Sequence, residues 1–384
     1  MKLPTDENAA MQGRIADKET SMKNSIAEKD AAMKDHIATL RKLTARKPRA
    51  KLGFFPTPLY KLENLSRLLN IELYIKRDDF TGMSLFGGNK IRKLETLMGD
   101  AMDKKCDTVL TYGATQSNHA MQTVTACRRL GLSPVLYLNA YVEPDEEDIR
   151  ANMLLNHVLG AEMHIIRGEN GETEAETEAR CFALGKGHAA RLEAQGRRCY
   201  DIPLGGASPV GSSAFIEGYC ELQAQCMDMG IEPDYVFSAT GTGGTLAGLV
   251  AGNRLLQAKA KVVGIAVSAK DLGYEVRCAE LANASLQWLD CDERVAADDF
   301  VVDRGYFAPG YEKPNAEATE AIRLLARTEG LLIDPVYTGK AFAGLLGSVR
   351  EGRVAPGGTV VFWHTGGATA LFAEKEILGA LSRS

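Results

Sequence analysis

The amino-acid sequence predicts an α/β protein with two lobes, each a largely parallel, twisted sheet covered by helices, preceded by an N-terminal helical extension. Two observations carry this prediction. The chain has 384 residues, which exceeds the size at which one hydrophobic core usually stops growing, so two lobes are favoured. From Phe54 onward, short β-branched runs alternate with segments of helical periodicity. This alternation is typical of parallel sheets with helices on both faces.

The predicted strands are short apolar runs, most of them separated by helical patterns. They cover residues 71–79, 106–113, 133–140, 161–168, 233–241, 261–268 and 358–367. In such sheets ligands bind beyond the carboxyl ends of the strands. We therefore expect the functional residues where these runs end.

The N-terminal extension, residues 1–48, contains an eleven-residue repeat. Met and Ile recur in register, and eleven residues make almost three helical turns, so these side chains form one narrow stripe. So thin a stripe is not expected to fold alone. The repeat predicts a solvated, partly helical extension without a catalytic role, with a self-association arm or a targeting device as the alternative. The stripe consists of Met11, Ile15, Met22, Ile26, Met33 and Ile37.

The composition argues against several classes of function. The net charge of -5 gives no reason to expect nucleic acid as a partner, and no apolar run approaches the length of a membrane span. The eight cysteines include no C-x-x-C pair, so a reduced, cytoplasmic protein is favoured over a disulfide framework. The six histidines have no H-x-x-x-H spacing, so we predict no metal site.

The segment SLFGGNKIRKLE, residues 84–95, places Lys90 at the predicted start of a helix. Acidic residues are usual there, because the positive end of the helix dipole disfavours an ammonium group. Near a bound cofactor such an amine is expected to have a lowered pKa, and its neutral form can condense with an aldehyde. By itself, Lys90 could equally be a surface lysine.

The strand at 233–241 ends in a glycine-rich loop that consists of Gly241, Thr242, Gly243, Gly244 and Thr245. Such a loop before a helix lets backbone N–H groups approach a phosphate. The loop lacks the third glycine of a dinucleotide site and the lysine of a Walker motif. It predicts a phosphate cradle, with a tight turn that binds nothing as the alternative.

Polar side chains also follow the strand at 106–113, where Ser117, Asn118 and His119 open the next helix. These groups, together with free backbone N–H groups, could hold a carboxylate. A simple helix cap is the alternative.

Three hydroxyl groups complete the candidate set. Thr365 ends the last strand, and its hydroxyl could contact a ring nitrogen or belong to a turn. Tyr311 and Tyr337 lie in loops rich in Pro and Gly, where tyrosine usually serves packing. A phosphate cradle, a lysine with a lowered pKa and no metal motif together favour pyridoxal 5'-phosphate, whose ring acts as an electron sink.

From about residue 50 to the C-terminus the sequence resembles the fold type II (tryptophan synthase β-like) pyridoxal-phosphate enzymes, in particular the group of D-cysteine desulfhydrase and 1-aminocyclopropane-1-carboxylate deaminase. Residues 1–48 lie outside the resemblance. The matching stretches are FPTPLYKLENLSRLL, IKRDDFTG, GGNKIRKLE, QSNHA, GTGGTLAGL, RTEGLLIDPVYTGKA and HTGG.

The resemblance implies a role for each candidate. Lys90 forms the Schiff base with the cofactor, Gly241 to Thr245 bind its phosphate, and Thr365 lies near the pyridine nitrogen. Ser117 faces the reacting carbon, and with Asn118 and His119 contacts the substrate; Asn118 matches a contact to the cofactor ring hydroxyl or to the substrate carboxylate. Tyr311 and Tyr337 match the two active-site tyrosines. The resemblance does not assign the group that protonates the leaving sulfur; our own hypothesis is Tyr337.

The resemblance further implies a small lobe at 89–203 inserted into a large lobe formed by 49–88 and 204–384, and a homodimer. The expected reaction is β-elimination on a small amino acid, D-cysteine first. Cysteate sulfo-lyase and the deaminase are alternatives, and a catalytically inactive scaffold is a third. In the deaminase pattern a glutamate follows the second active-site tyrosine, whereas this chain has Thr338; we therefore expect no appreciable opening of a cyclopropane ring.

Overall fold

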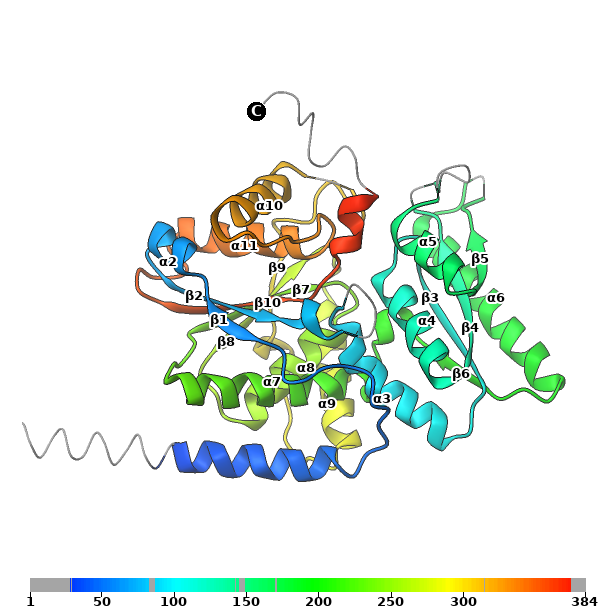
Figure 1. Cartoon of the computed structure of the whole chain (residues 1–384), viewed down its shortest axis with the longest axis horizontal. Helices are drawn as coiled ribbons and strands as arrows, with labels where there is room; N and C mark the ends of the chain where they lie inside the picture. The colour runs from blue at the N-terminus through cyan, green and yellow to red at the C-terminus, as the bar shows by residue number, and fades with distance from the viewer. Residues whose placement is uncertain are drawn as a thin grey trace, which may run out of the picture.

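The computed structural model describes residues 28, 30–82, 87–141, 143–144, 149–169, 171–313 and 315–373. These residues form two separate sheets (Figure 1), and each sheet with the helices packed on it is referred to below as a lobe. The prediction of an α/β fold with largely parallel sheets is confirmed. Within the described part of the chain, no helix is both long and apolar enough to cross a membrane.

The large lobe contains a six-stranded sheet with the order β1-β2-β10-β7-β8-β9. Its strands are parallel, except that β1 runs antiparallel to β2. β10 lies in the middle, so that Val361 pairs with Tyr74 on one side and Val236 on the other. The strands are β1 (Leu59–Lys61), β2 (Glu72–Arg77), β7 (Tyr235–Thr240), β8 (Lys261–Ala266), β9 (Val301–Asp303) and β10 (Thr359–His364).

Helices cover both faces of this sheet (Figure 1). Because successive side chains of a strand point to opposite faces, Val236 packs in the core beneath α7, α8 and α9, and Phe237 packs in the core beneath α2, α10 and α11. The helices are α2 (Glu63–Leu69), α7 (Pro209–Met229), α8 (Gly244–Leu255), α9 (Tyr274–Trp288), α10 (Ala316–Glu329) and α11 (Thr338–Arg350).

The small lobe contains a four-stranded parallel sheet with the order β5-β4-β3-β6. Leu136 of β4 packs towards α4, and Tyr137 packs in the core on the other face, which α6 covers. Helix α3 (Lys90–Asp103) runs between the lobes (Figure 1). The elements are β3 (Thr108–Ala114), α4 (Asn118–Leu130), β4 (Ser133–Asn139), α5 (Ala151–Val158), β5 (Glu162–Ile166), α6 (Glu174–Ala194) and β6 (Cys199–Ile202). Short 3-10 helices occur at η1 (Asp78–Phe80), η2 (Leu204–Gly206), η3 (Ala297–Asp299) and η4 (Ala368–Phe372).

The end of the N-terminal extension is a helix, residues 30–44, that packs against the large lobe below α7 (Figure 1). Ile37 is 5% exposed and Leu40 is 1% exposed, and both belong to the same core cluster as Phe215 of α7. The interpretation as a solvated extension is therefore wrong for this helix, because its apolar stripe is covered by the body of the protein. The repeat positions before residue 28 lie outside the described residues.

Candidate active site

A cavity of about 650 Å³ lies between the two lobes. It is bordered by the segments that follow β3, β7 and β10, because the carboxyl ends of the strands of both sheets face the same gap. Except for Gly244, every predicted site residue lines this cavity; these are Lys90, Ser117, Asn118, His119, Gly241, Thr242, Gly243, Thr245, Tyr311, Tyr337 and Thr365.

Lys90 is the first residue of α3, and its side chain reaches the cavity. The preceding backbone is tied to the end of β10, since the N–H of Asn89 donates to the carbonyl oxygen of Thr365 at 3.0 Å. The amine of Lys90 lies 3.4 Å from the carbonyl oxygen of Gly205. Burial lowers the pKa of Lys90 to about 8. About a tenth of this amine is therefore neutral, and nucleophilic, at pH 7, far more than for an ordinary lysine.

Lys93 is a second amine at this site, which sequence reasoning missed. Its side chain is fully buried, and Nζ donates to the carbonyl oxygen of Gly205 at 3.2 Å. Burial, and then the charge of Lys90, hold the pKa of Lys93 well below its usual value. Residues three apart on a helix share one face, so the position of Lys93 relative to Lys90 was a signal that could have identified it.

The glycine-rich loop connects β7 to α8 and leaves no room for a larger residue at Gly243 or Gly244. Gly243 has a φ of +87°, in the left-handed region. A Cβ on Gly244 would lie 2.7 Å from Nζ of Lys93. The loop thus brings the free N–H groups at the start of α8 next to a buried amine. The hydroxyl oxygen of Thr245, in the first turn of α8, accepts a hydrogen bond from the side-chain amide of Asn89 at 3.1 Å.

The start of α4 supplies the polar groups on the small-lobe side. Ser117 caps the helix, because its Oγ accepts the N–H of Ala120 at 3.2 Å. Asn118 is more constrained than we predicted: its side-chain oxygen accepts from the Asn152 amide at 2.8 Å and from the Thr369 hydroxyl at 3.2 Å. Asn118 therefore links α4 to α5 and to η4, in addition to lining the cavity.

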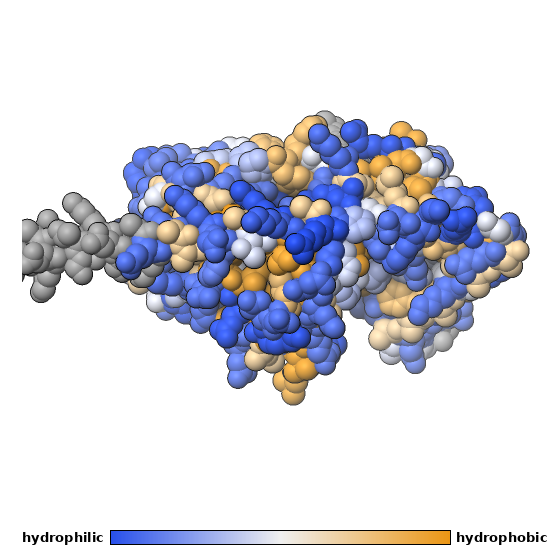
Figure 2. Space-filling model, turned by 90° about the horizontal axis from the view of Figure 1, so that it is seen from below, coloured by the Kyte–Doolittle hydropathy of each residue, from blue (hydrophilic) through white to orange (hydrophobic). Residues whose placement is uncertain are grey.

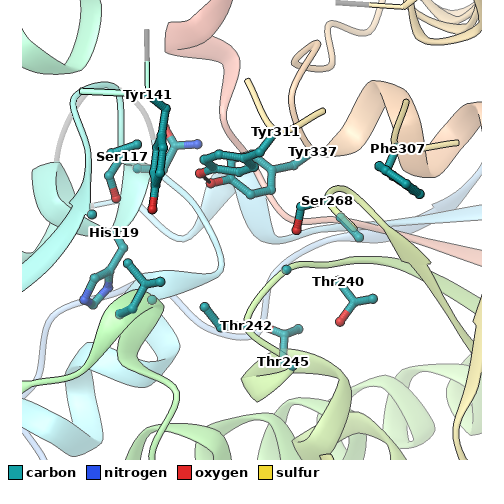
Figure 3. A pocket seen from close by; sticks show the side chains of 18 of the residues that line it. Ser117, His119, Tyr141, Thr240, Thr242, Thr245, Ser268, Phe307, Tyr311 and Tyr337 are labelled. Carbon is teal, nitrogen blue, oxygen red and sulfur yellow. Dashed lines mark hydrogen bonds between the residues drawn. The ribbon is translucent and has the colours of Figure 1, made fainter. Parts of the chain in front are cut away.

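His119 is 2% exposed and lines the cavity from below Ser117 (Figure 3). Its Nε2 lies 2.8 Å from the hydroxyl of Thr111, whereas its Nδ1 has no hydrogen-bond partner among the described residues. Burial, followed by the charges of Lys90 and Lys93, holds the pKa of His119 well below its usual value. The imidazole is therefore neutral at physiological pH.

Tyrosine side chains form one wall of the cavity (Figure 3). The hydroxyl groups of Tyr311 and Tyr337 are hydrogen-bonded to each other, and burial raises the pKa of both. Tyr141, which the sequence analysis missed, packs edge-on against Tyr311 with ring centroids 5.9 Å apart and donates to Glu178 at 2.8 Å. Tyr141 directly follows the 133–140 run, so the same strand-end rule could have found it.

Thr338 does not line the cavity. It is fully buried, and its hydroxyl donates to the Asp334 carboxylate at 2.6 Å. The same carboxylate accepts the backbone N–H groups of Val336 at 2.8 Å and Tyr337 at 2.7 Å. Asp334 thereby fixes the backbone that carries Tyr337, and Thr338 presents no charge to the site.

These residues fit pyridoxal 5'-phosphate. A phosphate needs N–H donors, and the glycine loop presents the start of α8 to the cavity, with the buried amine of Lys93 packed next to Gly244. An aldehyde needs a partly neutral amine, which Lys90 supplies. Lys90 and the glycine loop both line the cavity, whose volume of about 650 Å³ also leaves room for a small substrate.

Comparison with known proteins agrees with this arrangement. The chain is 40% identical over 330 residues to a candidate 1-aminocyclopropane-1-carboxylate deaminase of Pyrococcus abyssi, covering 86% of this chain and 94% of that protein. It is 39% identical over 337 residues to a D-cysteine desulfhydrase of Klebsiella pneumoniae, covering 87% and 98%. The crystal structure of a homologue of 1-aminocyclopropane-1-carboxylate deaminase matches with a TM-score of 0.78 and 35% identity, covering 88% and 98%.

The family model of the pyridoxal-phosphate dependent enzymes matches residues 50–366. This range contains both sheets and every residue that lines the cavity. The extension before residue 50 lies outside it, as the sequence analysis expected. The chain belongs to the family of pyridoxal-phosphate dependent enzymes.

Proposed function

We propose that the protein is a carbon–sulfur lyase that converts D-cysteine and water to pyruvate, ammonia and hydrogen sulfide. The observation that favours elimination over opening of a cyclopropane ring is the environment of Thr338, which does not separate D-cysteine from the rival substrate cysteate. Its hydroxyl is held by Asp334, and it lies where the deaminase pattern has a carboxylate beside the cofactor. Opening an unactivated cyclopropane requires a strongly electron-withdrawing ring, and a neutral threonine does not supply the charge that would favour it.

The cofactor would be held at three places. The amine of Lys90 would bond to it covalently, Gly241 to Thr245 together with Lys93 would hold its phosphate, and Thr365 would approach its ring nitrogen. When bound, pyridoxal 5'-phosphate supplies an electron sink for negative charge at the substrate α-carbon. Lys90, once displaced by the substrate amine, would accept the α-proton. Ser117 would orient the reacting carbon.

The departure of thiolate from the substrate requires only a weak acid in the protein. A thiol has a pKa of about 8.5, so thiolate departs without a strong acid. Because burial raises the pKa of Tyr311 and Tyr337, both phenols stay protonated. One hydroxyl donates to the other, which leaves the second hydroxyl hydrogen for the sulfur as the carbon–sulfur bond breaks.

A substrate panel tests this proposal. Purified holoenzyme is assayed under steady-state conditions with D-cysteine, L-cysteine, cysteate and 1-aminocyclopropane-1-carboxylate, and sulfide, sulfite and keto acids are measured. We expect the largest kcat/KM for D-cysteine, and no 2-oxobutanoate from the cyclopropane. Efficient ring opening would identify a deaminase, and faster release of sulfite than of sulfide would identify a sulfo-lyase; either outcome would overturn the desulfhydrase assignment.

We also propose a cytoplasmic homodimer. All eight cysteines are free thiols, which supports a reducing compartment. Light scattering coupled to gel filtration measures the mass in solution, and the mass of a single 41.5 kDa chain would contradict the dimer.

A further inference from the structure

The outer side of the small lobe carries a cluster of potential metal ligands that consists of Glu162, His164 and His188. Glu162 and His164 lie on β5, and because side chains two residues apart point to the same face of a strand, both face α6. His188 comes from α6. One ligand atom from each of the three residues lies within 4.8 Å of the other two. Nε2 of His164 is 2.8 Å, and Nε2 of His188 is 3.8 Å, from Oε1 of Glu162.

The two imidazole rings are held in place by Tyr137 of β4. The ring of His164 stacks on the ring of Tyr137, with centroids 4.5 Å apart and an interplanar angle of 14°. Nδ1 of His188 lies 3.1 Å from the hydroxyl of Tyr137. In the tautomer whose Nδ1–H donates to that hydroxyl, Nε2 carries a lone pair directed at the Glu162 carboxylate. Two acceptors that face each other require a cation or a proton between them.

Two imidazole nitrogens and one carboxylate oxygen are a donor set of Zn²⁺ and related borderline cations. Tetrahedral coordination with bonds of about 2.0–2.1 Å separates neighbouring ligand atoms by roughly 3.3 Å. The two separations to Glu162, 2.8 and 3.8 Å, lie on either side of that value, and the two histidine ligand atoms lie within 4.8 Å of each other, so side-chain rotations would have to bring the histidines together. The side chains of Glu162 and His164 are 51% and 37% exposed, which leaves a fourth position open to water.

We propose that Glu162, His164 and His188 form a binding site for a divalent transition metal ion of the Zn²⁺ class, which links β5 to α6. The sequence analysis predicted no metal site, because the two histidines are 24 positions apart and only the fold brings them together. β5 is an edge strand whose sole partner in the sheet is β4, so a metal link to α6 would secure it. None of the three ligands lines the cavity, so the site serves stability and not the reaction.

The Tyr137 hydroxyl has a specific part in this site. A ligating histidine usually donates its second ring N–H to a fixed acceptor, and removal of that acceptor typically weakens metal binding 10- to 100-fold. Tyr137→Phe keeps the ring on which His164 stacks and removes only the acceptor for His188. A decrease in Zn²⁺ affinity in Tyr137→Phe would therefore indicate a site in which Tyr137 orients His188. Incidental binding by two histidines would not depend on the Tyr137 hydroxyl.

Calorimetric titration of the chelator-treated holoenzyme with Zn²⁺ tests the proposal. We expect one ion per chain, an affinity at least 100-fold lower in the double variant His164→Gln/His188→Gln, and an affinity about 10-fold lower in Tyr137→Phe. His157→Gln, at an exposed histidine of α5, is the matched control and should bind as the unmodified protein does. Zn²⁺ should raise the Tm of the control and not that of the double variant.

Folding of each variant is checked by the absorbance of the bound cofactor and by turnover, which should stay unchanged. If the double variant does not fold, Glu162→Gln replaces it, because the half-exposed Glu162 can be changed without disturbing the core. Equal Zn²⁺ affinity in the control and in the ligand variants would overturn the proposal, as would the absence of binding to both. These outcomes are independent of which amino acid the enzyme consumes.

Discussion

The amines of Lys90 and Lys93 contact the same acceptor, the carbonyl oxygen of Gly205, at 3.4 and 3.2 Å. Both lysines lie on one face of α3, one turn apart; Lys93 is fully buried, and Lys90 lines the cavity. Burial and mutual repulsion disfavour two ammonium groups at such a separation. A bound phosphate would relieve this repulsion; in the proposed function Lys90 would react with the cofactor and Lys93 would contact its phosphate.

We expect Lys90→Ala to lose the covalently bound cofactor, because Lys90 presents a partly neutral amine to the cavity at the start of α3. Turnover should fall by a factor on the order of 10³ or more. Borohydride reduction of the holoenzyme followed by peptide mapping identifies the modified lysine. Reduced cofactor on Lys76, Lys93 or any other lysine would show that the assignment is wrong; Lys270 is the main competitor, because it also lines the cavity with a pKa lowered to about 8. Lys104→Ala, on the exposed surface, is the control.

Lys93→Met should have a different effect. The covalent bond to the cofactor should still form, but the affinity for pyridoxal 5'-phosphate should fall about 10- to 100-fold, because one hydrogen bond to a charged group contributes about 1.5–3 kcal/mol. Equilibrium titration of the apoprotein, followed by absorbance, measures this change. An unchanged affinity would mean that Lys93 serves only the packing beneath the glycine loop.

The rate of cofactor uptake should depend on pH with a midpoint near 8. The neutral amine of Lys90 reacts, and its pKa is lowered to about 8. The rate of cofactor uptake by the apoprotein should therefore rise about tenfold per pH unit below pH 8 and become constant above it. The rate for an ordinary lysine, with a pKa of about 10.4, would continue to rise above pH 8. Stopped-flow absorbance, with N-acetyl-lysine as the reference amine, records both profiles. A rate that still climbs at pH 10 would contradict the lowered pKa.

The hydrogen bond between Tyr311 and Tyr337 predicts coupled effects of substitution. Tyr311→Phe and Tyr337→Phe should each lower kcat/KM about 10- to 100-fold. The decrease in kcat/KM of the double variant should be smaller than the product of the two single decreases, which corresponds to a coupling free energy of about 0.5–3 kcal/mol. Tyr235→Phe, whose hydroxyl contacts the Arg353 carbonyl on the surface, is the matched control. Strict additivity would show that the two hydroxyls act separately.

The N-terminal helix should contribute to stability and not to catalysis. Leu40→Ala removes a fully buried side chain from the interface with α7, and we expect it to lower the free energy of unfolding by about 2–5 kcal/mol. Lys42→Ala, on the exposed side of the same helix, should change it by less than about 0.5 kcal/mol. Denaturant unfolding measures both.

Deletion of residues 1–45 should accordingly lower the Tm while kcat stays close to that of the full chain. The deletion removes Ile37 and Leu40 but no residue that lines the cavity. A truncated protein that folds and binds the cofactor, yet has lost turnover, would show that the extension takes part in the reaction.

Much of the cavity was predictable because of a general property of parallel sheets. Their carboxyl ends meet at one edge, so the residues that follow the predicted strands, such as Ser117 and Thr365, converge even though they are far apart in the sequence. The alternation of β-branched runs with helical segments and the glycine-rich loop are both visible in the local sequence. They depend on backbone preferences that neighbouring residues determine, and for this reason the fold class, the cofactor and eleven of the residues that line the cavity could be predicted.

The sequence by itself thus indicated seven of the ten strands found in the described residues, the loops at their edges and Lys90 as the candidate reactive lysine. The tertiary structure alone decided which side chains contact each other. Leu40 packs against α7, and the ring of Tyr141 contacts the ring of Tyr311. The hydroxyl of Thr338 is hydrogen-bonded to Asp334, and the ring of His164 lies next to the ring of His188. Each of these depends on the packing of elements that are distant in the chain. Periodicity identifies an apolar or polar face, but only three-dimensional packing selects the partner of that face.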